Sequence, residues 1–156
     1  MALDYLPIMA QASAPKPQRV LATPSKPSWF PITKPVSQSR IAILTSAALR
    51  LGSQEPFLPG EDVSYRLVPS DAKSDEIVID HHSRIGTVPR QDPEIVFPME
   101  ALATLVEQGV VGERSPVHVS FKGGIRQHQA VETQLAPAIA RELKQARVDL
   151  AFLIPY

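Results

Sequence analysis

The histidines are the side chains of this sequence that could most readily bind a metal ion, and they occupy positions 81, 82, 118 and 128. His81 and His82 are adjacent, so on a strand they would point to opposite faces, and only in a loop could both reach one ion. Asp80 could add a carboxylate, but the spacing matches no standard zinc pattern. Solvated or hydrogen-bonded imidazoles explain the pattern more simply, so we predict no metal site and keep His81 and His82 as candidate substrate-binding residues.

A glycine pair supplies the second candidate site. Gly123 and Gly124 follow Lys122 at the end of the alternating run 117–121, and Arg126 lies close by in the sequence. Backbone N–H groups exposed at glycines, together with one cation, suit a small carboxylate. Lys122, Gly123 and Gly124 are therefore further substrate-binding candidates, although a simple tight turn would give the same pattern.

Other kinds of site are excluded or weakly indicated. The chain has no cysteine, so these residues form no disulfide, no thiolate metal site and no cysteine nucleophile. Thr45, Ser46 and Gly52 stand where the loop after a strand could bind an anion, but neither GxGxxG nor GxxxxGK[ST] is present. The sequence also shows no nucleophile elbow and no helix with paired histidines.

The last part of the sequence predicts one helix followed by one strand. Val131, Leu135, Ile139 and Leu143 lie four residues apart, which places them on one helical face. Thr133 is the expected N-cap of this helix. The apolar run 148–154 then predicts a strand that is covered on both faces, as in a parallel sheet under helices.

The remaining elements indicate the fold class. We expect strands at 41–44, 63–68, 77–79 and 117–121, a helical turn through residue 76, a loop over 83–94 and a helix over 98–108. The buried stripe of that helix is expected to contain Leu102, Leu105 and Val106. Because strands alternate with helices, the sequence predicts an α/β fold with a mostly parallel open sheet and flanking helices.

Two regions divide the chain. Residues 1–38 contain seven prolines, which exclude a helix and a central strand, so we predict an extended proline-rich N-terminal arm. Its aromatic residues Trp29 and Phe30 would pack in a surface groove, or the arm would wrap a partner subunit. Residues 39–156 form the predicted α/β domain.

Composition restricts the class of partner and the compartment. Lys and Arg number 16, as do Asp and Glu, and this balance argues against nucleic-acid binding. No apolar run approaches the length of a membrane span, and the N-terminus lacks the pattern of a signal peptide. We therefore expect a cytoplasmic protein with no membrane partner.

Several motifs, in this order, resemble one family. They are WFPITKPV, RIAILTSAALRL, GEDVSYRLVPSDAKSDEIVIDHH, EIVFPMEALATLVEQGVVG, SPVHVSFKGG and VETQLAPAIARELKQARVDLAFLIP. Together they resemble the selenoprotein B component of glycine, sarcosine and betaine reductases and the related small subunit of D-proline reductase. The resemblance covers the chain from about Trp29 to its end.

The resemblance implies an α/β oxidoreductase component that helps to cleave a C–N bond reductively, with a dithiol as the electron source. It implies other reductase subunits as partners in a hetero-oligomer, and a small amine or amino-acid substrate activated by a carbonyl group in another subunit. In the D-proline enzyme this group is a pyruvoyl group. The family's redox selenocysteine or cysteine follows directly on the strand that here ends near Tyr156.

That redox position would be the one after Tyr156. Since selenocysteine is encoded by UGA, which is commonly read as a stop, we expect the chain to be the N-terminal part of a longer protein, with its α/β domain incomplete at the C-terminus. The isolated chain is then expected to be inactive. One alternative is a non-catalytic scaffold subunit of a hetero-oligomer. Another is a metal-dependent hydrolase or lyase that uses His81, His82 or His118.

Overall fold

A central strand, β1 (Arg40–Thr45), organises the structure, which is a computed structural model that describes residues 30–81 and 87–156. The other strands are β2 (Leu49–Leu51), β3 (Tyr65–Pro69), β4 (Ile77–Ile79), β5 (Glu113–Arg114), β6 (Val117–Phe121) and β7 (Leu150–Ile154). The helical elements are η1 (Val36–Gln38), η2 (Ser74–Glu76), α2 (Thr87–Gln91), η3 (Pro93–Ile95), α3 (Met99–Glu107), α4 (His128–Ala130), η4 (Val131–Leu135) and α5 (Ala136–Gln145). Residues 33–156 form one compact unit, and the predicted arm up to Trp29 lies outside the described residues.

The main sheet is mostly parallel. On one side β1 pairs in parallel with β5 and then β6, and on its other side it pairs in parallel with β7. β3 adds an antiparallel strand beyond β6. α3 precedes β6 and α5 precedes β7, so helices make the crossovers that parallel neighbours need. This arrangement confirms the predicted α/β class with flanking helices.

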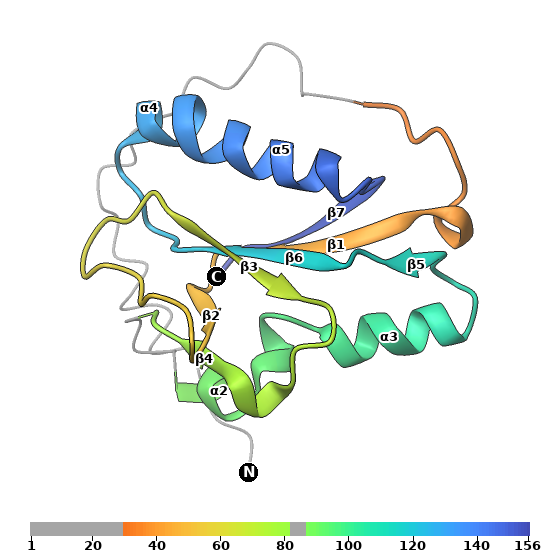
Figure 1. Cartoon of the computed structure of the whole chain (residues 1–156), viewed down its shortest axis with the longest axis horizontal. Helices are drawn as coiled ribbons and strands as arrows, with labels where there is room; N and C mark the ends of the chain where they lie inside the picture. The colour runs from red at the N-terminus through yellow and green to blue at the C-terminus, as the bar shows by residue number, and fades with distance from the viewer. Residues whose placement is uncertain (1–29, 82–86) are drawn as a thin grey trace, which may run out of the picture. The chain divides into compact units, whose positions relative to one another are not determined.

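Helices and a small second sheet cover the two faces of the main sheet (Figure 1). η4 and α5 lie over one face, where Leu135 of η4 and Ile139 of α5 pack with Val119 of β6. On the other face lie α3, which contacts β5, and the small sheet of β2 and β4, and Phe97, Leu49 and the β1 isoleucines form the larger core there. The alternation of β1 explains both cores, because Ile41 and Ile43 point to one face while Leu44 points to the other.

The helix predicted near the C-terminus is present, but it starts earlier than expected. Helical structure begins at His128, so Thr133 is not an N-cap; its hydroxyl instead donates to the carbonyl of Gln129 (2.8 Å). Residues 131–135 form a π-helical turn in which the N–H of Ala136 donates to the Val131 carbonyl. Pro137 follows this turn, and its missing N–H and bulky ring disfavour regular α-helical bonding there.

The region between β1 and β3 contains a strand that the sequence did not predict. β2 pairs antiparallel with β4, whose position at 77–79 was predicted. The helical turn η2 and the helix α3 also agree with the predictions, whereas the loop expected over 83–94 contains the short helices α2 and η3. No helix in the described parts of the chain is long and apolar enough to cross a membrane.

β7 is an edge strand in this structure. It pairs with β1, and no other described strand pairs with it. Leu150 and Ile154 pack against the core, but Phe152 is 56% exposed and Leu153 is 63% exposed. Within the described residues, no further strand pairs with β7 and no helix covers its middle, so the coverage on both faces that its apolar sequence favours is not present in this part of the chain.

Candidate functional site

The carboxyl ends of three parallel strands meet at one edge of the sheet. Ser46 follows β1, Gly123 lies two residues beyond β6, and Tyr156 lies two residues beyond β7. In open α/β sheets, ligands bind outside the carboxyl ends of the strands. We call Ser46, Gly123 and Tyr156, with the neighbouring His81 and Gly124, the strand-end site.

Hydrogen bonds join the three strand ends. The N–H of Ser46 donates to the carbonyl of Ile154 (3.2 Å), and the Ser46 carbonyl accepts from the N–H of Gly123 (2.9 Å). The Ser46 hydroxyl accepts from the N–H of Tyr156 (2.8 Å) and donates to the Tyr156 carbonyl (3.3 Å). One serine therefore contacts the backbone that follows both neighbouring strands.

Positions 123 and 124 require glycine for different structural reasons. A Cβ at Gly123 would lie 3.1 Å from the carbonyl oxygens of both Ser46 and Tyr156, a distance that would push the neighbours apart. Gly124 has a φ of +77°, a conformation that side chains disfavour, and a Cβ there would meet open space. The predicted glycine turn is present, and its backbone lies beside Tyr156.

His81 reaches the strand-end site from β4. Its ring meets the Tyr156 ring edge-on, with the centroids 4.9 Å apart and the planes at 70°. The guanidinium of Arg90 in α2 donates to the His81 carbonyl (2.6 Å) and so fixes the backbone of this residue. His82 lies outside the described residues. The structure thus brings His81, Gly123 and Gly124 to one edge of the sheet.

The ammonium group of Lys122 is bonded to the backbone of another loop. The side chain is buried, and its Nζ donates to the carbonyl of Leu58 (2.5 Å) in the loop before β3. Asp62 holds this loop by accepting from the N–H groups of Leu58 and Ser64 (2.7 Å each). Burial by itself would raise the pKa of Asp62, but the Ser64 hydroxyl, these two N–H groups and the charge of Arg66 together lower it.

An apolar cavity opens beside the strand-end site. It has a volume of about 340 Å³ and is lined by Leu44, Ser46, Phe121, Leu153, Ile154 and Pro155. A second cavity of about 270 Å³ lies under α5 and shares Leu44 and Phe121 with the first. Ser46 is the polar member of the first lining, so this space suits an apolar group better than a charged one.

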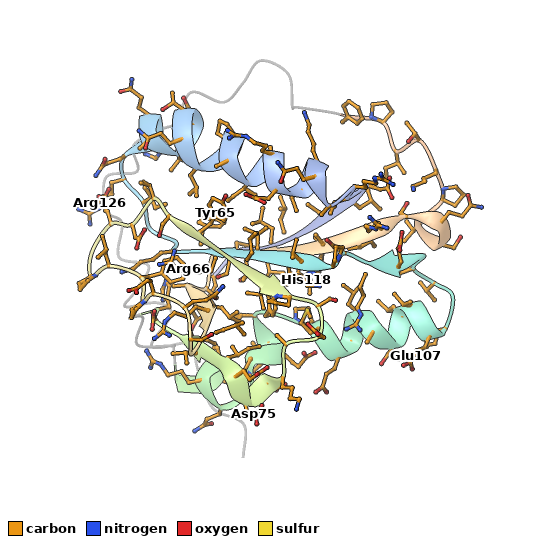
Figure 2. The ribbon with its side chains drawn as sticks, viewed as in Figure 1. Tyr65, Arg66, Asp75, Glu107, His118 and Arg126 are labelled. Carbon is orange, nitrogen blue, oxygen red and sulfur yellow. The ribbon has the colours of Figure 1, made fainter. Side chains whose placement is uncertain are left out.

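His118 lies in the core. Its side chain is fully buried, and its Nδ1 accepts from the N–H of Ile43 (2.9 Å). Nε2 therefore carries the proton, and it has no hydrogen-bond partner among the described residues. The ring packs edge-on against Phe97 at 5.8 Å. Burial, with a smaller contribution from Arg114, lowers the pKa of His118 to about 4. Figure 2 labels this residue on the sheet.

The other sequence candidates are not part of the strand-end site. Thr45 is buried and its hydroxyl accepts from the N–H of Ala47, while Gly52 lies in the turn after β2 and donates to Glu76. Within residues 30–81 and 87–156, no three His, Asp or Glu side chains are placed to hold a metal ion. No residue pattern indicated the Ser46–Tyr156 contact, because a serine after an apolar strand is common.

Comparisons with known proteins show a similarity to a reductase subunit. No family model matches the chain, and no solved structure matches it. The chain is similar to the D-proline reductase subunit gamma of Acetoanaerobium sticklandii, with 28% identity over 127 residues. These residues are 81% of this chain and 52% of that protein, so the chain spans about half of the length of the curated relative that it matches. The similarity supports the D-proline reductase part of the resemblance.

Proposed function

We propose that this chain is a component of a multi-subunit reductase that cleaves a C–N bond of glycine, sarcosine, betaine or D-proline. The similarity to D-proline reductase subunit gamma carries this proposal. A dithiol would supply two electrons and two protons. The C–N bond breaks, a C–H and an N–H bond form, and the dithiol becomes a disulfide. Such a donor is maintained in the reducing cytoplasm, where we place the protein.

The redox residue of the proposed reaction is a selenocysteine or cysteine that directly follows Tyr156. None of the 156 residues is a cysteine, so the chain as given does not contain it. The location is chemically suitable, because substrates in open α/β sheets bind beyond the strand ends. A carbonyl group, of the pyruvoyl kind in the D-proline enzyme, would come from a partner subunit and activate the substrate amine.

Substrate contacts are proposed for the residues at the strand-end site. The turn at Gly123 and Gly124 would bind a carboxylate through the N–H of Gly124, because the N–H of Gly123 donates to the Ser46 carbonyl, and His81 and His82 would flank it. Lys122 would reach the substrate only after its bond to the Leu58 carbonyl breaks. The apolar cavity beside Ser46 would then take an uncharged part of the substrate or of a partner subunit.

The test compares the 156-residue chain with the product of the reading frame that continues past codon 156. Each is co-expressed with its partner subunits and incubated with a dithiol and each of the four substrates. We expect a UGA codon after Tyr156, turnover of at least one substrate by the longer product, and none by the shorter one. Full turnover by the 156-residue chain alone would overturn the proposal.

A non-catalytic scaffold subunit is the alternative. The exposed apolar side chains of β7 favour it, because such an edge is suited to contact with another chain. An ordinary stop codon after Tyr156, together with a stable complex that needs this subunit only for assembly, would support the scaffold and refute the redox role.

A further inference from the structure

The Ser46 hydroxyl forms a hydrogen bond that takes the place of a missing backbone hydrogen bond between β1 and the end of β7. In a parallel pair, a residue donates its N–H to a carbonyl of the neighbouring strand. Its own carbonyl accepts from the N–H that lies two residues further along that neighbouring strand. Ser46 donates to Ile154, so its carbonyl should accept from Tyr156. That carbonyl is already bonded to the N–H of Gly123, and the Ser46 hydroxyl accepts from Tyr156 in its place.

The Ser46 hydroxyl holds the chain just past the end of the β1–β7 ladder. The ladder ends with the pair Thr45 and Ile154, and in this register residue 156, not Pro155, is the next to direct its N–H toward β1. Beyond that pair, the Ser46 hydroxyl bonds both the N–H and the carbonyl of Tyr156. Gly123 lies against the same carbonyl oxygen and leaves no room for a side chain.

We infer that Ser46 is a positioning residue that fixes the peptide group leading from Tyr156 to the next residue, and that Gly123 provides the space for it. The inference rests on the proposed function, in which that next residue performs the redox step. Ser46 and Pro155 both line the apolar cavity, so the backbone that Ser46 fixes lies at the rim of that cavity. Ser46 itself exchanges no electrons and no protons with the substrate.

The experiment uses the complete chain extended by one cysteine after Tyr156, which is then the sole thiol of the protein. Its alkylation rate by iodoacetamide and by a bulky maleimide is measured against pH, in the folded protein and in urea. The variants are Ser46→Ala, Ser46→Thr and Gly123→Ala. Ser64→Ala is the matched control, because it removes a serine hydroxyl that bonds Asp62 in another loop.

In the parent, we expect the maleimide to react more slowly with the folded protein than in urea, and the pH profile of the folded thiol to differ from that of the unfolded thiol. Ser46→Ala removes two hydrogen bonds and should reduce this protection about tenfold, returning the pH profile to that of the unfolded chain. Gly123→Ala should act in the same direction. Ser46→Thr should restore the parent behaviour, and Ser64→Ala should leave it unchanged.

Two outcomes would overturn the inference. One is a Ser46→Ala variant that folds, as shown by its urea midpoint, and keeps the parent protection and pH profile. The other is an equal loss in Ser64→Ala, which would indicate general loosening. Neither measurement needs turnover, so protection that depends on Ser46, found together with a longer product that reduces none of the four substrates beside its partner subunits, would refute the proposed function alone.

Discussion

Protonation of His118 should destabilise the folded protein as the pH falls. The imidazole is buried, and its Nδ1 accepts from the N–H of Ile43. A protonated Nδ1 would itself be a donor, and a backbone N–H cannot accept a hydrogen bond from it. A second proton would have to sit on Nδ1, and this would break the bond to Ile43 and bury a charge near Arg114. The unfolded chain has no such cost, so its histidine titrates normally.

The size of the effect follows from the pKa difference. The pKa of His118 falls from 6.5 to about 4, chiefly through burial. The unfolded state takes up a proton at higher pH than the folded state. The contribution of His118 to the free energy of unfolding is therefore fully present above pH 6.5 and is lost as the pH falls toward 4. The difference corresponds to about 3 kcal/mol over this window.

The assay is urea unfolding at several pH values between 7 and 4.5, for the parent and for His118→Asn. The asparagine oxygen can accept from Ile43 in place of Nδ1, but it does not titrate. The variant should lose about 2 kcal/mol at pH 7, because part of the ring packing against Phe97 is gone. Its free energy of unfolding should then depend less on pH than that of the parent.

The control is His128→Asn, since His128 is exposed at the start of α4. Comparing each variant with the parent cancels the titration of carboxylates that both proteins share. Equal pH dependence of the parent and His118→Asn would show that the buried imidazole does not couple protonation to folding, and would refute the reasoning.

Two further predictions concern a buried ion pair and an exposed edge. Asp80→Asn should lower the free energy of unfolding by about 2 kcal/mol in urea, because Asp80 bonds Arg50 at 2.7 Å and both side chains are less than a fifth exposed; Lys34→Met, which breaks a more exposed pair, should change it little, and equal losses would contradict the argument. Phe152→Lys should weaken the self-association that an open apolar edge promotes, as measured by sedimentation. Leu58→Lys, at an exposed site in a loop, should leave self-association unchanged. Indistinguishable sedimentation of the two variants would show that β7 is not the contact.

Local patterns predicted the elements that lie over the sheet. The four-residue spacing from Val131 to Leu143 identified the buried face of α5, and Leu135 and Ile139 are buried as expected. In α3, however, Leu105 of the predicted stripe is 38% exposed while Met99 is buried. The helix period was correct, but which side of the stripe packs most closely depends on where the sheet lies.

The site was predicted only in part. The glycine turn after β6 was recognisable from its residue types, and His81 was placed correctly at the end of β4. The direction of the Lys122 side chain was not predictable, because its acceptor at Leu58 lies 64 residues away in the sequence. Whether His81, His82, Lys122, Gly123 and Gly124 bind substrate stays a prediction.

The sequence by itself determined the order of β1, β3, β4, β6 and β7 and of the helices α3 and α5, the α/β class and the absence of a thiol among these residues, because periodicity and composition are local properties. Only the tertiary structure decided that Ser46 meets Tyr156, 110 residues away, and that His118 is buried against Ile43, 75 residues away. Such contacts depend on which strands become neighbours, and neither serine nor histidine carries a local pattern that specifies its partner.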